Sequence, residues 1–457
     1  MNGLSRRGLL TGAAAAAGAL AHGTAPAGAA RQTWDGTIRV LGLGYDMPEP
    51  IRKQAQQDLG FGVQSTSMFP ADIQRVVSQE PATWDIFSCA QQDVAEFWPA
   101  RSIQPVEIAR IRRWKSITPL YKLGRARPST RSRYGQGDAA FRRLYVDPNR
   151  SGRWQSAPDV PASVKRQLVQ WVDESTGKPV GLEPKFCTGL PGTFNFDSFG
   201  YNSSVLKKQP EVVSWAELLN ARWKGRVGLN GFDPQGGLQD VANAVQAARL
   251  MRFVDLGDPT RKEIDSLVKL LLAYQKQGQF FDIWPQGGDP VDWMVKRKVV
   301  LCTMYAPTIV SLSALGFPIR QADPPEGYRA FAGLLSISAA VTDPAQLDAC
   351  YDFLNWWHSG FPGAFLLREG YYNAVPSTIQ QHMTAGEYAY WMDGRAADQT
   401  YLDASGDRSV AKGRHRDGGS FFSRARRISS WNSTPRQQDY FIGRWAEFIA
   451  SFTPPGP

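Results

Sequence analysis

Along the chain, short apolar runs alternate with stretches in which apolar residues recur at helical spacing. The first part predicts strands over 37–41, 62–67 and 84–88, with helices over 49–59 and 71–79 between them. After a basic segment, the pattern predicts helices through 238–248 and 264–272 and a buried strand over 299–305. Strands that alternate with helices indicate a largely parallel, doubly wound sheet. The predicted fold class is therefore α/β.

The pattern continues to the C-terminus and predicts more than one structural unit. A strand over 333–340, an apolar-faced helix through 347–357 and a final helix over 441–452 follow. A chain of 457 residues usually forms two or more domains or lobes. Residues 125–161 are rich in Arg, Ser, Gly and Pro, so we expect a long irregular excursion there.

The first 29 residues have the pattern of an export signal. Arg6 and Arg7 match the twin-arginine pattern, and the apolar stretch over 13–20 is too short to span a bilayer. Small side chains at 27–29 predict cleavage after Ala29. We therefore expect export by the twin-arginine translocase to the periplasm. The alternative is an alanine-rich helix of the folded protein.

Charge is concentrated in one part of the chain. Removal of the signal lowers the formal net charge from +10 to +8, and residues 110–166 alone carry 15 Lys or Arg against three acids. We interpret this segment as a solvated surface insertion, and contact with an anionic membrane face or partner is the alternative. The expected compartment disfavours nucleic acid as a partner.

Residues that typically hold metals or perform catalysis do not form a known motif. The cysteines are far apart and have no metal-ligand spacing, so we expect no metal or cofactor and mostly buried thiols, with one disulfide left open. No histidine lies in the frame of a catalytic triad, and we assign no catalytic residue. Pairs of carboxylates are not visible in a sequence, which leaves a hydrolase open.

Three features indicate that the protein holds a ligand. Phe-Asp-Pro-Gln-Gly-Gly at 232–237 precedes a predicted helix, where glycine amides could approach a ligand and Asp233 could cap the helix or bind an ammonium. Gln-Gly-Gly-Asp-Pro at 286–290 has a similar composition, and for both motifs a simple capped turn is the alternative. Aromatic residues at the ends of elements can line a cleft and stack on sugars or cations. These include Tyr45, Phe194, Tyr305, Phe331, Tyr371 and Tyr372.

Several short sequence motifs resemble those of the extracellular solute-binding proteins of ABC importers, most of all the spermidine/putrescine-binding group. They are Gly-Tyr-Asn at 200–202, Ser-Trp-Ala-Glu-Leu at 214–218, Trp-Lys-Gly-Arg-Val at 223–227, the strand at 301–305 and Asn-Ala-Val-Pro at 373–376. Asp233 stands where that family places an amine-binding aspartate, and Tyr305 replaces a ligand-stacking tryptophan. The resemblance covers about 36–104 and 194–377 and is poor over 110–190.

The resemblance implies a type II periplasmic-binding-protein fold with a two-strand hinge near 194–201 and 330–334. The expected divisions are a signal peptide (1–29), a first lobe (30–198) with a basic irregular insertion at about 110–190, a second lobe (199–329), a return to the first lobe (330–380) and a C-terminal helical extension (381–457). The expected ligand-binding residues are Tyr45, Phe194, Asp233, Tyr305 and Phe331.

The implied function is capture of a small polar solute by lobe closure and delivery to the permease of an ABC importer, by a monomer. Where polyamine binders carry Trp-x-Asp, this chain has Phe-Ala-Gly at 331–333. The loss of a carboxylate leaves three ligands open: a monoamine held by Asp233, a neutral solute, or an anion held by glycine amides. Two other functions are also open: a secreted two-lobed hydrolase acting on a carbohydrate or ester, and an interaction protein that docks through its basic segment.

Overall fold

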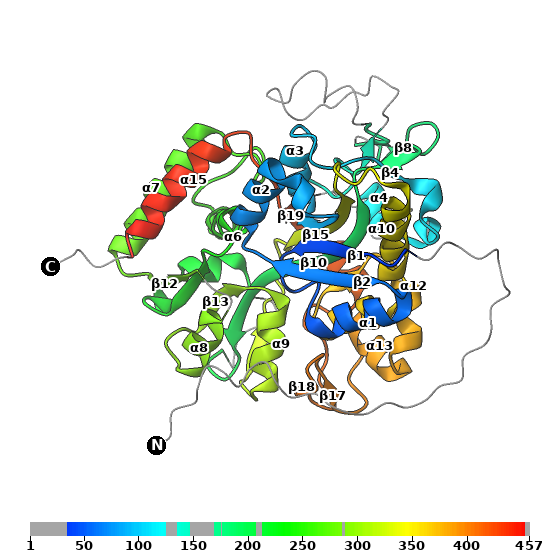
Figure 1. Ribbon diagram of the computed structural model, residues 1–457. Helices are drawn as coiled ribbons and strands as arrows, with labels where there is room; N and C mark the ends of the chain where they lie inside the picture. Colours follow the sequence, from blue (N-terminus) through cyan, green and yellow to red (C-terminus); the bar gives the residue numbers. More distant parts are fainter. Residues whose placement is uncertain are drawn as a thin grey trace.

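A computed structural model describes residues 34–124, 135–146, 169–174, 176–206, 213–285 and 288–452. A long curled sheet runs through both halves of the molecule in the order β12-β11-β13-β10-β15-β3-β1-β2 (Figure 1). Its strands are β1 (Thr37–Gly42), β2 (Gly62–Ser67), β3 (Ile86–Ala90), β10 (Leu190–Asn202), β11 (Val227–Asn230), β12 (Phe280–Trp284), β13 (Leu301–Met304) and β15 (Tyr328–Ile337).

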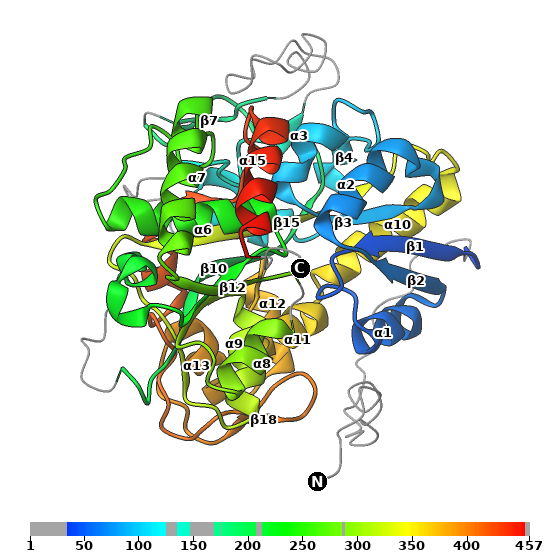
Figure 2. The ribbon, with the colours of Figure 1, turned by 90° about the vertical axis from the view of Figure 1, so that its left-hand side faces the viewer.

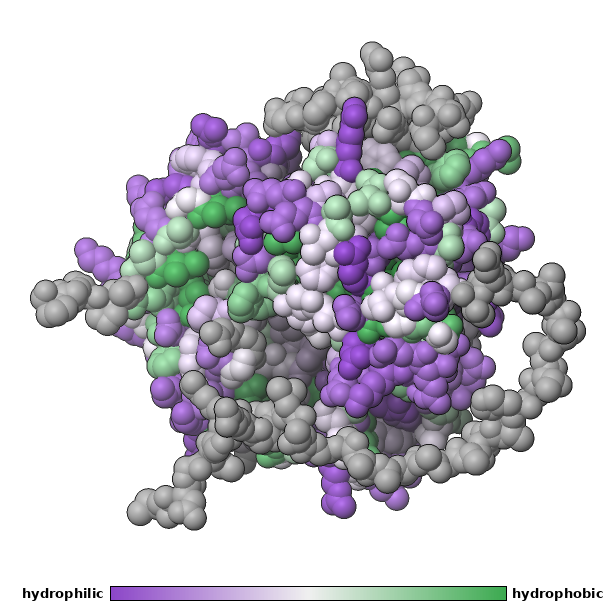
Figure 3. Space-filling model, viewed as in Figure 1, coloured by the Kyte–Doolittle hydropathy of each residue, from purple (hydrophilic) through white to green (hydrophobic). Residues whose placement is uncertain are grey.

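The first lobe is built on three parallel strands, because β1 pairs in parallel with both β2 and β3. The antiparallel strand β15 completes this half of the sheet. The helices of this lobe include α1 (Glu49–Leu59), α2 (Pro70–Gln79), α3 (Val94–Phe97), α4 (Pro119–Leu123), α10 (Pro344–Trp357), α11 (Phe361–Arg368), α12 (Pro376–Ile379), α13 (Ala385–Asp393) and α14 (Phe421–Ala425). Figure 3 shows hydrophilic side chains over α1, which buries only Ile51 and Ala55.

The second lobe repeats this architecture. Strands β11, β12 and β13 are parallel, and β10 pairs antiparallel with β13. The helices are α6 (Pro234–Ala247), α7 (Arg261–Lys276), α8 (Asp289–Val295) and α9 (Ala306–Ala314). The final helix, α15 (Gln438–Ala450), lies beside α7 in both ribbon views and adds Phe441, Trp445 and Phe448 to the core of this lobe (Figures 1 and 2).

Strand β10 belongs to both lobes. Residues Leu190 to Asp197 pair with β15, and Ser198 to Tyr201 pair with β13. The chain returns from β14 (Ile319–Gln321) to β15, and it crosses a third time between β19 (Ile428–Trp431) and α15. The lobes are therefore joined by three connections, one more than the two expected from the sequence. The third connection exists because the C-terminal extension ends on the second lobe.

The basic segment is only partly within the described residues, and Arg112, Arg113 and Lys115 are exposed there. Residues 125–134 and 147–168 lie outside the described ranges. In the described part of the segment, Trp114, Phe141 and Tyr145 are buried in the core of the first lobe. Short strands β4 (Val106–Glu107), β6 (Tyr145–Val146) and β9 (Phe186–Cys187) form a small sheet. The described part of the segment therefore combines exposed charges with aromatic side chains that belong to the core.

The cysteines are all free and buried, as expected for most of them, so the disulfide that the sequence left open does not form. No helix within the described ranges is both long enough and apolar enough to cross a membrane. The part of the chain that the structure describes contains no group of three or more acidic, histidine or cysteine side chains suited to a metal ion.

Candidate functional site

A pocket lies between the two lobes at the carboxyl ends of β1, β3, β11 and β13. Ligands of open α/β sheets typically bind at this edge. The described residues that line it come from both lobes and from the connections between them. They are Leu43, Tyr45, Pro70, Ala90, Gln92, Asp93, Asp197, Phe232, Asp233, Gln235, Tyr305, Phe331, Tyr371 and Asn432.

Aromatic rings form most of the walls. Tyr45 stacks on Tyr371 with ring centroids 4.5 Å apart, and Phe331 meets the Tyr45 ring edge-on at 6.2 Å. On the second lobe, Phe232 and Tyr305 are in contact at 6.5 Å. Phe69 of the first lobe also reaches Phe232, so the two lobes touch beside the pocket. Such rings present the negative faces that attract organic cations.

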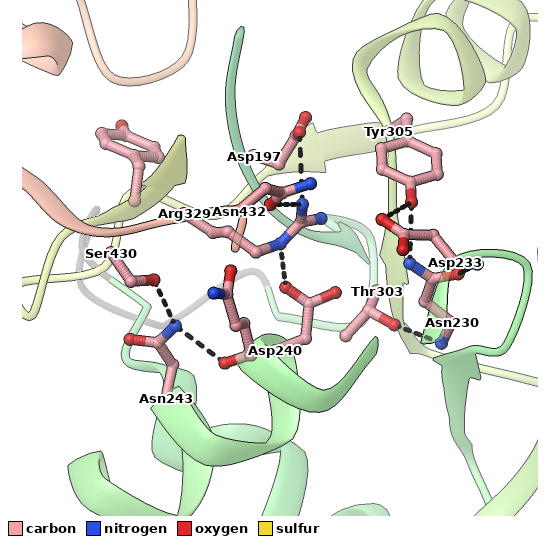
Figure 4. A network of polar contacts seen from close by, with 12 residues as sticks. Asp197, Asn230, Asp233, Asp240, Asn243, Thr303, Tyr305, Arg329, Ser430 and Asn432 are labelled. Atoms are coloured by element: carbon pink, nitrogen blue, oxygen red, sulfur yellow. Dashed lines mark hydrogen bonds and ion pairs between the residues drawn. The ribbon is translucent and has the colours of Figure 1, made fainter. Parts of the chain in front are cut away.

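Asp233 is held at the start of α6, where it performs the capping role expected from the sequence. Its Oδ1 accepts a hydrogen bond from the Gln235 amide at 3.1 Å, and its Oδ2 accepts one from the Tyr305 hydroxyl at 3.3 Å. Tyr305 in turn accepts a bond from the Asn230 side-chain amide at 3.0 Å (Figure 4). The carboxylate is therefore oriented from two sides and retains lone pairs for a ligand.

The glycines of the 232–237 motif have a different role from the one expected. The helix begins at Pro234, not near 238, so both glycines lie in its first turn. A Cβ on Gly236 would lie 2.6 Å from Asp233 Oδ2, and one on Gly237 would lie 2.4 Å from the Asn230 carbonyl oxygen. These glycines allow close packing of α6. The other motif is only partly described, because 286 and 287 lie outside the described residues.

Behind the pocket, Arg329 is completely buried in a polar network (Figure 4). Its Nε donates to Asp240 Oδ1 at 2.8 Å and one Nη donates to the Asn432 side-chain oxygen at 2.8 Å. The same Nη lies 3.9 Å from Asp197 Oδ2. Burial raises the pKa of Asp197 to about 6 and that of Asp240 to about 7, although Arg329 opposes both shifts. Arg329 thus compensates both of these buried carboxyl groups.

Asp93 faces the pocket from the first lobe. Its Oδ1 accepts a bond from the Gln74 side chain at 2.9 Å and its Oδ2 accepts one from the Ala90 amide at 3.0 Å. Burial raises the pKa of Asp93 to about 7, with smaller contributions from Glu96 and Asp233. No Lys or Arg is among the described residues that line the pocket, which makes its surface acidic.

The structure brings together four of the five residues expected at the site, namely Tyr45, Asp233, Tyr305 and Phe331. Phe194 lies in the core instead, 1% exposed and stacked on Tyr372 at 5.4 Å, because it points away from the pocket on β10. Sequence reasoning missed Asp93, Asp197, Arg329 and Asn432. A charged residue inside an apolar strand, such as Asp197 in Phe-Asn-Phe-Asp-Ser-Phe, is the signal that could have indicated them.

Two lobes with parallel strands, joined by antiparallel crossing strands around a pocket, define the type II periplasmic binding protein fold. Residues 141–360 match the family model of bacterial extracellular solute-binding proteins. Among curated proteins, no match was found.

Solved structures of this fold resemble the whole described molecule. A putative spermidine/putrescine ABC transporter from Listeria monocytogenes has a TM-score of 0.56 and 10% identity, with 90% of this chain and 98% of that chain covered. The spermidine/putrescine ABC transporter substrate-binding protein PotD from Streptococcus pneumoniae has a TM-score of 0.55, 12% identity and 91% and 99% coverage. The binding protein AgtB from Agrobacterium tumefaciens, in complex with agropinic acid, has a TM-score of 0.53, 12% identity and 91% and 98% coverage.

These findings confirm the resemblance to extracellular solute-binding proteins and the two-lobed α/β fold expected from the sequence. The match of residues 141–360 also supports the expected class of function, solute binding. The neighbours differ in their ligands, so the choice of solute must be argued from the residues of this pocket.

Proposed function

We propose that this protein captures a small organic cation between its lobes and delivers it to the permease of an ABC importer. The observation that carries the proposal is the lining of the pocket. Asp93 from the first lobe and Asp233 from the second face a space walled by aromatic rings. A buried ammonium needs a carboxylate partner, and aromatic faces stabilise the rest of a cation.

The charges distinguish a cation from the two other ligands that the sequence left open. An anion would have to enter a pocket lined by three carboxyl groups, without a lining Lys or Arg among the described residues. Of the glycine amides proposed to hold an anion, that of Gly237 already donates to the Asp233 carbonyl oxygen at 2.8 Å. A neutral solute would leave Asp93 and Asp233 without compensation. The cation is therefore the ligand that the pocket favours.

Carboxylates on opposite lobes would couple capture to closure. Arg329 already compensates Asp197 and Asp240, which leaves Asp93 and Asp233 for the ligand. A cation that contacts both is bound more tightly when the lobes approach, and this differential affinity is what shifts a hinged protein to its closed form. The Phe-Ala-Gly sequence at 331–333 removes one carboxylate, and Asp93 offers another from a different element.

The test is calorimetric titration of the processed protein with 1,4-diaminobutane, butylamine and butanol. We expect both amines to bind and butanol, which lacks the charge, to bind at least tenfold more weakly. Asp233→Asn keeps the helix cap, since Asn caps as well as Asp, but it should weaken amine binding by about 2 to 3 kcal/mol.

The matched control for this variant is Asp343→Asn. Asp343 caps α10 in the same way, through a bond from the Gln346 amide, and it lies outside the pocket. Amine affinity should stay unchanged in this control. Equal binding of butanol and butylamine, or equal affinity in the Asp233→Asn variant, would contradict the proposal.

The proposal includes export and assembly. The twin-arginine signal, with cleavage after Ala29, would send a folded monomer to the periplasm. Residues 1–33 lie outside the described ranges, so this part depends on the sequence pattern. The division into a first lobe, a second lobe, a return segment and a C-terminal extension also remains a proposal.

One observation favours the hydrolase as a second candidate. Asp93, with its pKa of about 7, and Asp233 could act as a general acid and its partner on a carbohydrate. Mass spectrometry of amine and oligosaccharide substrates after incubation would detect product. A solute released unaltered supports binding, whereas turnover lost in Asp93→Asn would support the hydrolase.

A further inference from the structure

A second crevice lies on the side of the molecule that carries the C-terminal extension. It separates α9 of the second lobe from α13 and from β18 (Arg408–Val410), which forms a hairpin with β17 (Tyr401–Leu402). The hairpin packs against α9, and both ribbon views show these elements side by side (Figures 1 and 2). None of its lining residues belongs to the pocket described above.

Arg416 lines this crevice and is 93% buried, yet it forms no ion pair within the part of the chain that the structure describes. Its guanidinium lies 4.8 Å from the ring of Tyr372 and 4.6 Å from that of Trp391. One Nη donates to the Trp391 carbonyl oxygen at 3.1 Å and the other to the Gly370 carbonyl oxygen at 3.4 Å. The charge is held by rings and carbonyl groups but is not neutralised. Burial lowers the pKa of Arg416 accordingly.

Arg414 provides a second cation at the same crevice. Its Nη atoms donate to Ser313 Oγ at 3.0 Å and to the Ile319 carbonyl oxygen at 3.1 Å, and its buried Nε has no partner among the described residues. Asp417 is the lining acid, and it pairs with Arg414 at 3.4 Å, but it also pairs with Arg320 at 2.7 Å and accepts a bond from the Gln321 amide. Two guanidinium groups thus share less than one carboxylate, although a buried charge is costly unless it is paired.

We propose that this crevice binds the carboxylate of a small organic acid, with Arg416 and Arg414 as its charged partners. The guanidinium fork of arginine matches a carboxylate, and charge-assisted bonds of this kind are the strong ones. The remaining walls suit a short apolar body, because Ile309, Val310 and Val410 line the crevice together with Tyr390 and Trp391. The crevice shares no lining residue with the amine pocket, and it lies between the C-terminal hairpin and α9.

The experiment titrates the processed protein with sodium butyrate, with butyramide as its uncharged analogue and with sodium phosphate, at constant ionic strength. We expect butyrate to bind with at least tenfold higher affinity than butyramide. Arg416→Gln should weaken butyrate binding at least tenfold. The matched control is Arg408→Gln, an exposed arginine on the same hairpin, for which the affinity should change less than twofold.

A second variant keeps the proposal testable if Arg416→Gln does not fold, as judged by its circular dichroism melt. Ser313→Asp places a carboxylate beside Arg414, so it should retain or raise the melting temperature and abolish the stabilisation by butyrate. The proposal is overturned if butyrate does not bind, or if it stabilises Ser313→Asp as much as the wild type. Binding of phosphate without butyrate would overturn the organic acid assignment.

Discussion

Arg329 and Arg416 are both buried, but their surroundings differ. Arg329 lies behind the interlobe pocket and is compensated by Asp240, Asp197 and the Asn432 side chain. Arg416 lies beside the second crevice and contacts rings and backbone carbonyl groups. A charge that is neutralised within the protein supports the fold. A charge that is left without a counter-ion identifies a place where a ligand can supply one.

The two crevices therefore select opposite ligands. The interlobe pocket presents carboxyl groups because Arg329 compensates only Asp197 and Asp240, and the pocket favours a cation. The second crevice presents guanidinium groups because Asp417 is already shared, and it favours an anion. Net charge alone, at +10, would not have indicated an acidic pocket.

The largest effect in the comparison of the two arginines is expected when Arg329 is replaced. Arg329→Met leaves Asp197 and Asp240 buried without a counter-ion, and such losses typically cost about 3 to 5 kcal/mol. We expect the free energy of unfolding in urea to fall by this amount at pH 7.5, where both acids would otherwise be ionised. A smaller loss is expected at pH 5, because pKa values of about 6 and 7 mean that both carboxyl groups are then mostly protonated.

A double variant provides the control for this experiment. Adding Asp240→Leu to Arg329→Met removes one of the orphaned acids, so part of the lost stability should return. The exposed counterpart, Arg320→Met, breaks a surface ion pair with Asp417 and should cost less than about 1 kcal/mol. If the double variant loses as much free energy of unfolding as the two single variants together, Arg329 does not compensate Asp240.

The sequence predicted the outer parts of this architecture well and its buried polar interior poorly. The first five elements were placed within two residues, because their hydrophobic periodicity was clean. Strand β15 was placed five residues too late, since Arg329 interrupts its apolar pattern. Arg329 lies inside this strand and is the centre of the polar network.

The site was predictable where one element determined the placement and not where the lobes meet. Asp233, Tyr305, Tyr45 and Phe331 could be expected in the cleft, because each lies close to the end of a predicted element or on a hinge strand. Asp93 is oriented by a bond from the Gln74 side chain on another element, which no local pattern describes. In α6, polar residues at 235, 239 and 243 repeat every four positions, and this stripe faces the third connection through a bond from Gln239 to the Trp431 carbonyl oxygen.

The pH dependence of stability tests the acidic interlobe pocket through Asp93. The pKa of Asp93 is about 7 in the folded protein and about 4 in an unfolded chain, so the folded state holds the proton more tightly between these values. The stability of the ligand-free protein should fall as pH rises from 4 to 7, relative to Asp93→Asn, by up to about 1.4 kcal/mol per pH unit. Thermal melts of both proteins at matched pH measure this difference.

Amine binding should show the complementary trend. Deprotonated Asp93 is the form that pairs with an ammonium, so affinity for butylamine should increase from pH 5 to pH 8 in the wild type. In Asp93→Asn this increase should be smaller, with any remaining slope due to Asp197 and Asp240. Parallel pH profiles for the two proteins would remove Asp93 from the ligand contacts.

We expect the smallest change in stability on replacement of Arg416. The contrast with Arg329 requires this change to be small. Arg416→Met exchanges a buried, unpaired charge for an apolar side chain of similar length, which removes a desolvation cost as well as two ring contacts. These terms oppose each other, so we expect the free energy of unfolding, without added organic acid, to change by less than about 1 kcal/mol. A loss of 3 kcal/mol, equal to that at Arg329, would mean that the protein compensates Arg416 internally, and the distinction between the two arginines would fail.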